Sequence, residues 1–135
     1  MRSHFFAVVV VLVFGSANAA DAPWPQFRGP GGSGVAEDAK VPAQIGPEKN
    51  LAWKVAVPPG MSSPVVVGEQ IVFTAFENNK LYTLAYSKAE GKELWRKEAP
   101  AKKIEPYLKS EGSPAASTPA TDGEKIVSYF GSCGL

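Results

Sequence analysis

The chain has 135 residues, with 14 basic and 13 acidic side chains, one histidine and one cysteine. This near balance of charge argues against a nucleic-acid-binding protein, which needs an excess of lysine and arginine to contact phosphates. The lone cysteine, Cys133, excludes both a disulfide within the chain and a zinc site built from several cysteines.

The first 19 residues are expected to form a secretory signal peptide. Arg2 and His4 give a basic start, residues 5–14 are an unbroken apolar run, and Ala17-Asn18-Ala19 supplies small residues for a signal peptidase. The alternative is a membrane anchor, but the run is about half as long as the ~20 apolar residues of a spanning helix. We therefore expect cleavage after Ala19, a periplasmic or extracellular protein, and no stable membrane insertion. Without Arg2 the 14 basic residues become 13, equal to the 13 acidic ones.

Residues 20–50 are rich in glycine and proline and poor in β-branched residues. Proline removes the backbone donor that a regular ladder needs, and glycine allows tight reversals, so we expect an extended lead-in. Trp24 and Phe27 are expected to anchor it against the folded body. The alternative is a disordered linker, although aromatic residues are depleted in such segments.

Residues 51–100 are expected to contain an outer strand followed by a complete four-stranded unit. Turn residues separate the strands: Gly68-Glu69 suits a two-residue hairpin turn, and Asn78-Asn79 can adopt left-handed backbone angles at low cost. The expected strands are 51–57, 65–67, 71–76, 81–86 and 93–98.

The third of the four strands of this unit is apolar on both faces. Because side chains alternate along a strand, Leu81 and Ala85 point one way, while Tyr82, Leu84 and Tyr86 point the other. Such a sheet must be covered on both sides, and no segment after the leader shows helical periodicity. An all-β fold of stacked, four-stranded antiparallel blades, the β-propeller, satisfies these patterns. A stand-alone β-sandwich-like domain is the alternative.

An internal repeat supports stacked units. Residues 62–72 return as residues 117–127, at an offset of 55 with six identities in eleven positions. Trp53-Lys54 and Pro58 return as Trp95-Arg96 and Pro100, at an offset of 42. The repeat indicates units that bury their apolar faces by stacking on neighbours.

The two offsets differ by 13 residues, so residues 101–113 are expected to form an inserted polar loop before a second blade begins at 114–135. We interpret the loop as a solvated connector, and the alternative is a binding loop on the rim. Propellers usually need about 4–8 blades. We therefore expect the propeller to be incomplete in this chain, as in a fragment or a truncated reading frame.

Residues 85–95 carry a resemblance to a known family. Ala85, Gly91 and Trp95 match, at the correct spacing, the tryptophan-docking motif of propellers related to pyrroloquinoline quinone enzymes, with Ser87 where Asp is usual and Glu90 where Thr is usual. Residues 24–30 also resemble the opening of secreted bacterial proteins with such repeats. The resemblance covers most of the chain after the leader. It implies a structural docking motif made of Ala85, Gly91, Trp95 and Trp53.

No catalytic, cofactor-binding or metal-binding residue can be assigned. The chain after the leader has no histidine, which removes the commonest general base and nitrogen ligand. Quinone dehydrogenases of the wider family use an adjacent cysteine pair that is missing here. We expect an exported, non-catalytic binding or scaffold module that needs no cofactor, with an unidentified protein or polysaccharide partner. The alternative is a fragment of a quinone-dependent dehydrogenase whose active-site blades lie outside this chain.

Overall fold

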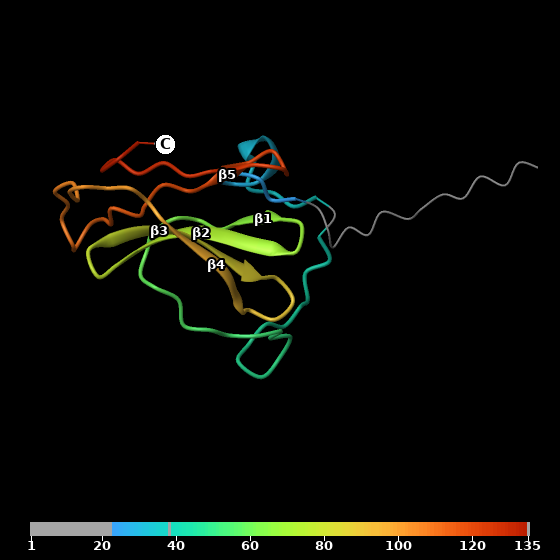
Figure 1. The fold of residues 1–135 in the computed structure, drawn as a ribbon. Helices are drawn as coiled ribbons and strands as arrows, with labels where there is room; N and C mark the ends of the chain where they lie inside the picture. The colour runs from blue at the N-terminus through green and yellow to red at the C-terminus, as the bar shows by residue number, and fades with distance from the viewer. Residues whose placement is uncertain (1–22, 38, 135) are drawn as a thin grey trace, which may run out of the picture.

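The computed structural model describes residues 23–37 and 39–134, so the expected signal peptide lies outside the described residues. Within these ranges the chain is mostly β, with a four-stranded sheet, a two-stranded sheet and a short 3-10 turn (Figure 1). The elements are η2 (Pro30–Gly32), β1 (Val65–Val67), β2 (Gln70–Glu77), β3 (Lys80–Ser87), β4 (Glu93–Glu98), β5 (Ala120–Thr121) and β6 (Ile126–Val127).

The larger sheet is an antiparallel meander in the order β1-β2-β3-β4. Its turns use the residues that the sequence predicts: Gly68 has a φ of 54°, and Asn78 and Asn79 have φ values of 51° and 62°. These left-handed angles fit tight hairpin turns because they match the twist of the flanking strands. The expected all-β class and the four-stranded antiparallel unit are confirmed, and the described residues do not form a closed propeller.

The sequence repeat is also a structural repeat. Val66 lies opposite Ile71 in the first hairpin, and Thr121 lies opposite Ile126 in the second, so both partners are displaced by the same 55 residues. The second turn is closed by the Asp122 carboxylate, which accepts the backbone N–H groups of the two residues before Ile126 at 2.9 and 2.7 Å. The two copies therefore share one pairing register.

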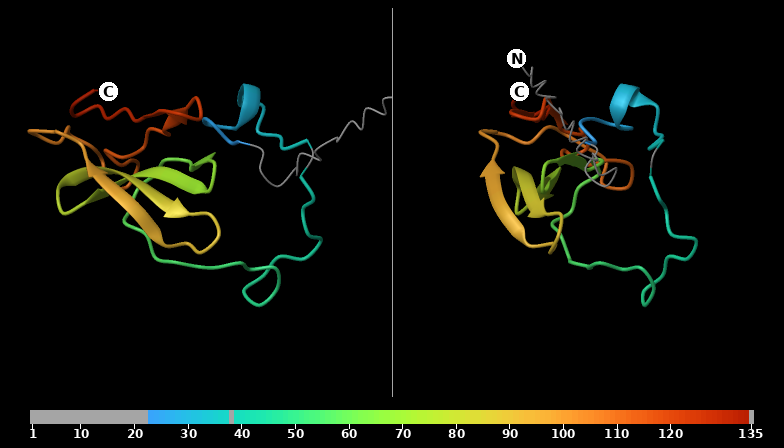
Figure 2. Two further views of the ribbon diagram at one scale, coloured as in Figure 1. Left: turned by 45° about the vertical axis from the view of Figure 1, so that its right-hand side comes forward. Right: turned by 90° about the vertical axis from the view of Figure 1, so that its right-hand side faces the viewer.

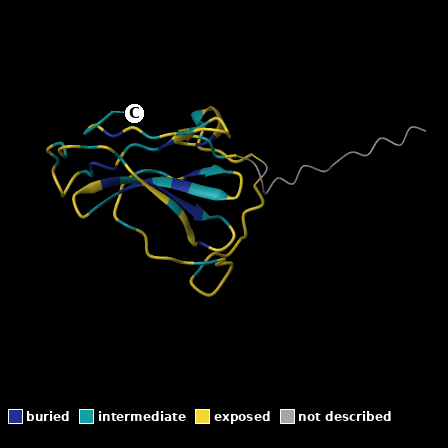
Figure 3. Cartoon of the chain, viewed as in Figure 1, coloured by how far each residue is buried: buried dark blue, intermediate teal, exposed yellow. Residues whose placement is uncertain are grey.

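Both faces of the larger sheet are covered in part, as the apolar pattern predicts (Figure 3). On one face Val72 and Ala85 pack with the partly buried Ile126 of the second hairpin. On the opposite face Leu84 and Tyr86 form a separate cluster. The face that carries Val72 and Ala85 also carries Leu81. Leu81 forms a third cluster with Ala115 and Phe130 from the later part of the chain. The sheet thus lies between the later part of the chain and the segment that precedes β1.

The expected outer strand at 51–57 is wrong, because residues 51–64 form no strand. This segment follows an extended path below the sheet (Figure 2). A strand needs a neighbour along its length, and the backbone bonds from β2 reach it at Pro59, whose carbonyl accepts the Phe76 N–H at 2.7 Å. Alternation alone therefore gave the wrong prediction, and Val55 and Val57 remain exposed.

The lead-in is anchored at Trp24, as expected. The Trp24 N–H donates to the Val66 carbonyl at 3.1 Å, and the Val66 N–H donates back at 2.9 Å. The next carbonyl, of Pro25, accepts the Thr121 N–H at 2.9 Å, so the lead-in contacts both hairpins.

Phe27 is not an anchor, since it is 59% exposed. It lies within a turn closed by the Gly29 N–H and the carbonyl three residues earlier, which presents its side chain to water.

Candidate functional site

Trp53 docks on the turn that joins β3 to β4. Its indole N–H donates to the Lys88 carbonyl at 2.9 Å. Its ring lies against Gly91, where an added Cβ would fall 2.5 Å from the Trp53 Cε3 atom. Gly91 is buried and has a φ of 67°, so glycine is required there both for space and for backbone angle. The contact joins the segment before β1 to the turn between β3 and β4.

Ser87 organises the docking turn. Its hydroxyl accepts the Glu90 N–H at 3.2 Å, and its carbonyl accepts the Gly91 N–H at 2.8 Å. Ser87 is one of the two departures from the docking motif, which usually has Asp at this position. A serine oxygen can accept the same kind of local backbone bond that an aspartate makes, so the departure keeps the turn closed.

Trp95 makes a separate contact on the opposite face of the sheet from Leu84. It lies opposite Ala85 in the β3–β4 ladder and packs against Val65 and Val72. Its indole N–H donates to the Gln70 side-chain oxygen at 2.8 Å. The structure therefore places Ala85 with Trp95, and Gly91 with Trp53. Gln70 was not expected from the sequence as the partner of Trp95, and the one signal for it is that a packed indole N–H needs an acceptor.

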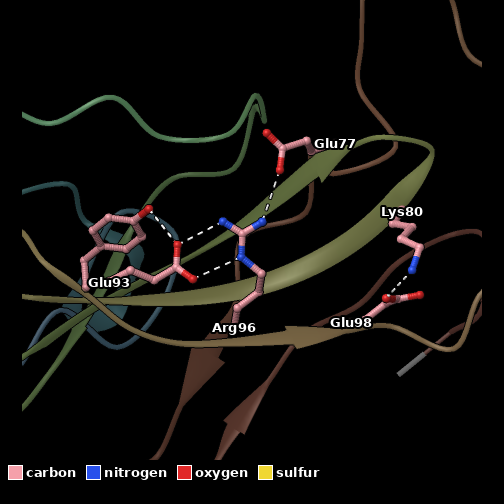
Figure 4. A network of polar contacts seen from close by, with 6 residues as sticks. Glu77, Lys80, Glu93, Arg96 and Glu98 are labelled. Atoms are coloured by element: carbon pink, nitrogen blue, oxygen red, sulfur yellow. Dashed lines mark hydrogen bonds and ion pairs between the residues drawn. The ribbon is translucent and has the colours of Figure 1, made fainter.

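A polar network crosses β2, β3 and β4 (Figure 4). The Arg96 guanidinium binds Glu93 through two hydrogen bonds of 3.0 and 2.9 Å and reaches Glu77 at 3.1 Å. The Tyr86 hydroxyl donates to Glu93 at 3.1 Å. Arg96 also lies 5.0 Å from the centre of the Tyr82 ring, within cation–π range. Glu77 and Glu93 lie at the surface, and both pair with Arg96, a contact that no spacing in the sequence indicates.

The network does not prepare an acid catalyst. The hydrogen bonds from Arg96 lower the pKa of Glu93, whereas a carboxylic acid that donates protons near neutral pH needs a raised pKa. Burial, followed by the bond to Glu93, raises the pKa of the Tyr86 hydroxyl. Both directions favour ionised Glu93 beside neutral Tyr86. The arrangement holds β2, β3 and β4 together at the surface.

The inserted loop at 101–113 is partly packed. Ile104 contacts the cluster around Leu81, and the Tyr107 ring meets Phe76 edge-on at 5.7 Å between ring centres. Leu108, in contrast, is 66% exposed. The loop is thus pinned to the sheet at two points, with its tip in solvent.

Two features are absent from the described residues. Within 23–37 and 39–134, no three histidine, cysteine, aspartate or glutamate side chains gather as metal ligands would. Over the same ranges, no helix has the length and apolar character to span a bilayer. Cys133 is half-buried beside Phe130, in contact with the cluster at the end of the sheet.

Comparison with known proteins gives no relative. No family model matches the chain, and no match is found among the curated proteins or the solved structures.

Proposed function

We propose that this chain belongs to an exported, non-catalytic repeat protein built from propeller-like blades, which acts as a binding or scaffold module. The observation that supports it most is the docking of Trp53 on Gly91 and on the Lys88 carbonyl. The tryptophan comes from the segment before the sheet and reaches the turn where the resemblance to quinone-type propeller repeats locates a docking glycine. Such a contact joins consecutive units.

The repeated hairpin supports the same proposal. A unit with apolar residues on both faces cannot bury them alone, and stacking on similar units is the usual solution. Here the first unit packs against the second hairpin through Ile126, while Trp53 docks on it from the preceding segment. Loops between stacked sheets would then be free to contact a protein or polysaccharide partner.

The proposed export can be tested by expressing the complete chain in a Gram-negative host. Mass spectrometry of the periplasmic fraction should find a protein that begins at Ala20. In a matched Ala19→Pro variant, which blocks cleavage, the precursor should accumulate at the membrane. Full-length protein confined to the cytoplasm would reject export.

The non-catalytic part of the proposal is tested against the quinone dehydrogenase alternative. Because that alternative places the active-site blades outside this chain, the test uses a longer recombinant protein that would contain them. It is mixed with pyrroloquinoline quinone and calcium, and the quinone absorbance and alcohol-dependent dye reduction are followed. We expect neither uptake nor turnover. Saturable uptake of the quinone with alcohol-dependent reduction of the dye would overturn the scaffold proposal.

A further inference from the structure

The second hairpin has an open edge where the first is covered. β2 pairs with β1 on one side and with β3 on the other. β6 holds the equivalent position in the second copy, and among the described strands it pairs with β5 alone. The Thr121 N–H donates to Pro25 rather than to β6, so the backbone groups of its partner Ile126 also point away from the hairpin and are open to another strand.

A groove of about 800 Å³ lies beside this edge. Six residues line it: Thr83, Trp95, Lys97, Ile126, Val127 and Ser128. Trp95 and Ile126 are half-buried and apolar, and Val127 is 48% exposed. Across the groove, the Thr83 hydroxyl donates to the Ser128 hydroxyl at 2.9 Å, which fixes the second hairpin to the sheet. The groove is thus apolar along β6 and held at a defined width.

The first unit shows what fills the equivalent space. There β3 pairs with β2, so that Tyr86 lies opposite Ile71, and the turn after β3 carries Gly91 to the ring of Trp53. Trp95 follows Trp53 by 42 residues, and Ile126 follows Ile71 by 55. The repeat equivalents of Trp53 and Ile71 therefore both line the groove.

We propose that this groove receives a β-strand followed by a glycine turn, of the sequence type of residues 80–92. This inference rests on the proposed function as a stacked repeat protein. The strand pairs with the outer edge of β6, and its residue equivalent to Tyr86 lies opposite Ile126. Its glycine, equivalent to Gly91, then lies against the ring of Trp95.

The test uses a synthetic peptide with the sequence of residues 80–92, which contains no tryptophan. Added to the protein, it should shift the tryptophan emission to shorter wavelength in a saturable way. The shift should vanish in the Trp95→Phe protein. NMR should show slowed exchange of the Ile126 amide, whose N–H points away from β5, in the peptide complex, which locates the binding at the outer edge of β6.

Two peptide variants complete the test. Gly91→Val places a side chain where the ring must lie, so affinity should fall at least about tenfold, the equivalent of ~1.4 kcal/mol. Ala89→Ser, at an exposed position of the turn, should leave affinity unchanged. The proposal is overturned if there is no saturable shift, if the valine peptide binds equally well, or if protection falls on other strands. Concentration-dependent dimers that protect the Ile126 amide without peptide would instead assign the groove to a second copy and also overturn the proposal.

This outcome is separable from the proposed function. If the peptide fails to bind while Trp53 and Gly91 still prove to be energetically coupled, the repeat packing stands and only the open edge of β6 has been misassigned.

Discussion

Ser63 and Thr118, which hold equivalent places in the two copies of the repeat, are joined by a hydrogen bond of 3.0 Å from the Ser63 N–H to the Thr118 hydroxyl. The contact continues through Thr74, whose hydroxyl donates to the Ser117 carbonyl at 3.1 Å. The two copies therefore pack on each other at the very residues that introduce their hairpins. A sequence repeat alone does not require such a contact, since equivalent segments of two units can lie far apart.

Thr118→Val should destabilise the protein by about 1–3 kcal/mol, because the half-buried Ser63 N–H loses its acceptor. Thr118→Ser keeps the oxygen and should cost much less. Urea denaturation of the two variants measures the difference. Equal losses for valine and serine would mean that this hydrogen bond contributes nothing to the contact between the copies.

The bond between Trp95 and Gln70 should be measurable as a coupling. Trp95→Phe removes the indole N–H, and Gln70→Ala removes its acceptor. A double-mutant cycle by urea denaturation should give a coupling of about 1 kcal/mol, typical of a side-chain hydrogen bond. Losses that add without coupling would show that Trp95 is held by packing on Val72 and Ala85 alone.

Stability should fall at acid pH in a way that depends on Glu93. Its pKa is lowered in the folded state by the hydrogen bonds from Arg96, so the stabilisation is complete above the ordinary glutamate pKa. It is lost as the pH falls through the lowered folded-state value. Glu93→Gln should therefore flatten the acid limb of a stability–pH curve measured by thermal unfolding.

Glu48→Gln, at an exposed position, is the matched control and should leave the acid limb unchanged.

Tyr86 gives the opposite dependence, because its pKa is raised by burial and by Glu93. Its contribution is complete below the ordinary tyrosine pKa and is lost as the pH rises through the raised value. Tyr86→Phe should flatten the alkaline limb. A Glu93→Gln curve that matches wild type at acid pH would show that the network is energetically silent.

The sequence predicted the four-stranded unit well, since its turns depend on local residues. Asn78-Asn79 and Gly68 specify their hairpins without help from distant parts of the chain. The strand at 51–57 could not be judged in this way, because a strand exists only if another backbone lies beside it. Within 51–57 only Trp53 is partly buried, so the alternation there indicates neither pairing nor burial.

The site was predicted only in part. Gly91 and the two tryptophans carry a recognisable spacing, so their structural role was expected. The pairing of Arg96 with Glu77 was not, because it depends on the register of three strands and joins residues 19 apart. For the same reason Gln70 could not be named as the partner of Trp95, which is 25 residues away.

The most direct test of docking between repeat units is the energetic coupling of Trp53 to Gly91. Gly91→Ala combines backbone strain with a collision against the ring, while Gly68→Ala, with a φ of 54° and open space around it, has strain alone. By urea denaturation we predict that Gly91→Ala costs about 1–3 kcal/mol more than Gly68→Ala, as overpacking does. In a Trp53→Ala background that excess should disappear. An equal cost of Gly91→Ala in both backgrounds would contradict docking of Trp53 on this turn.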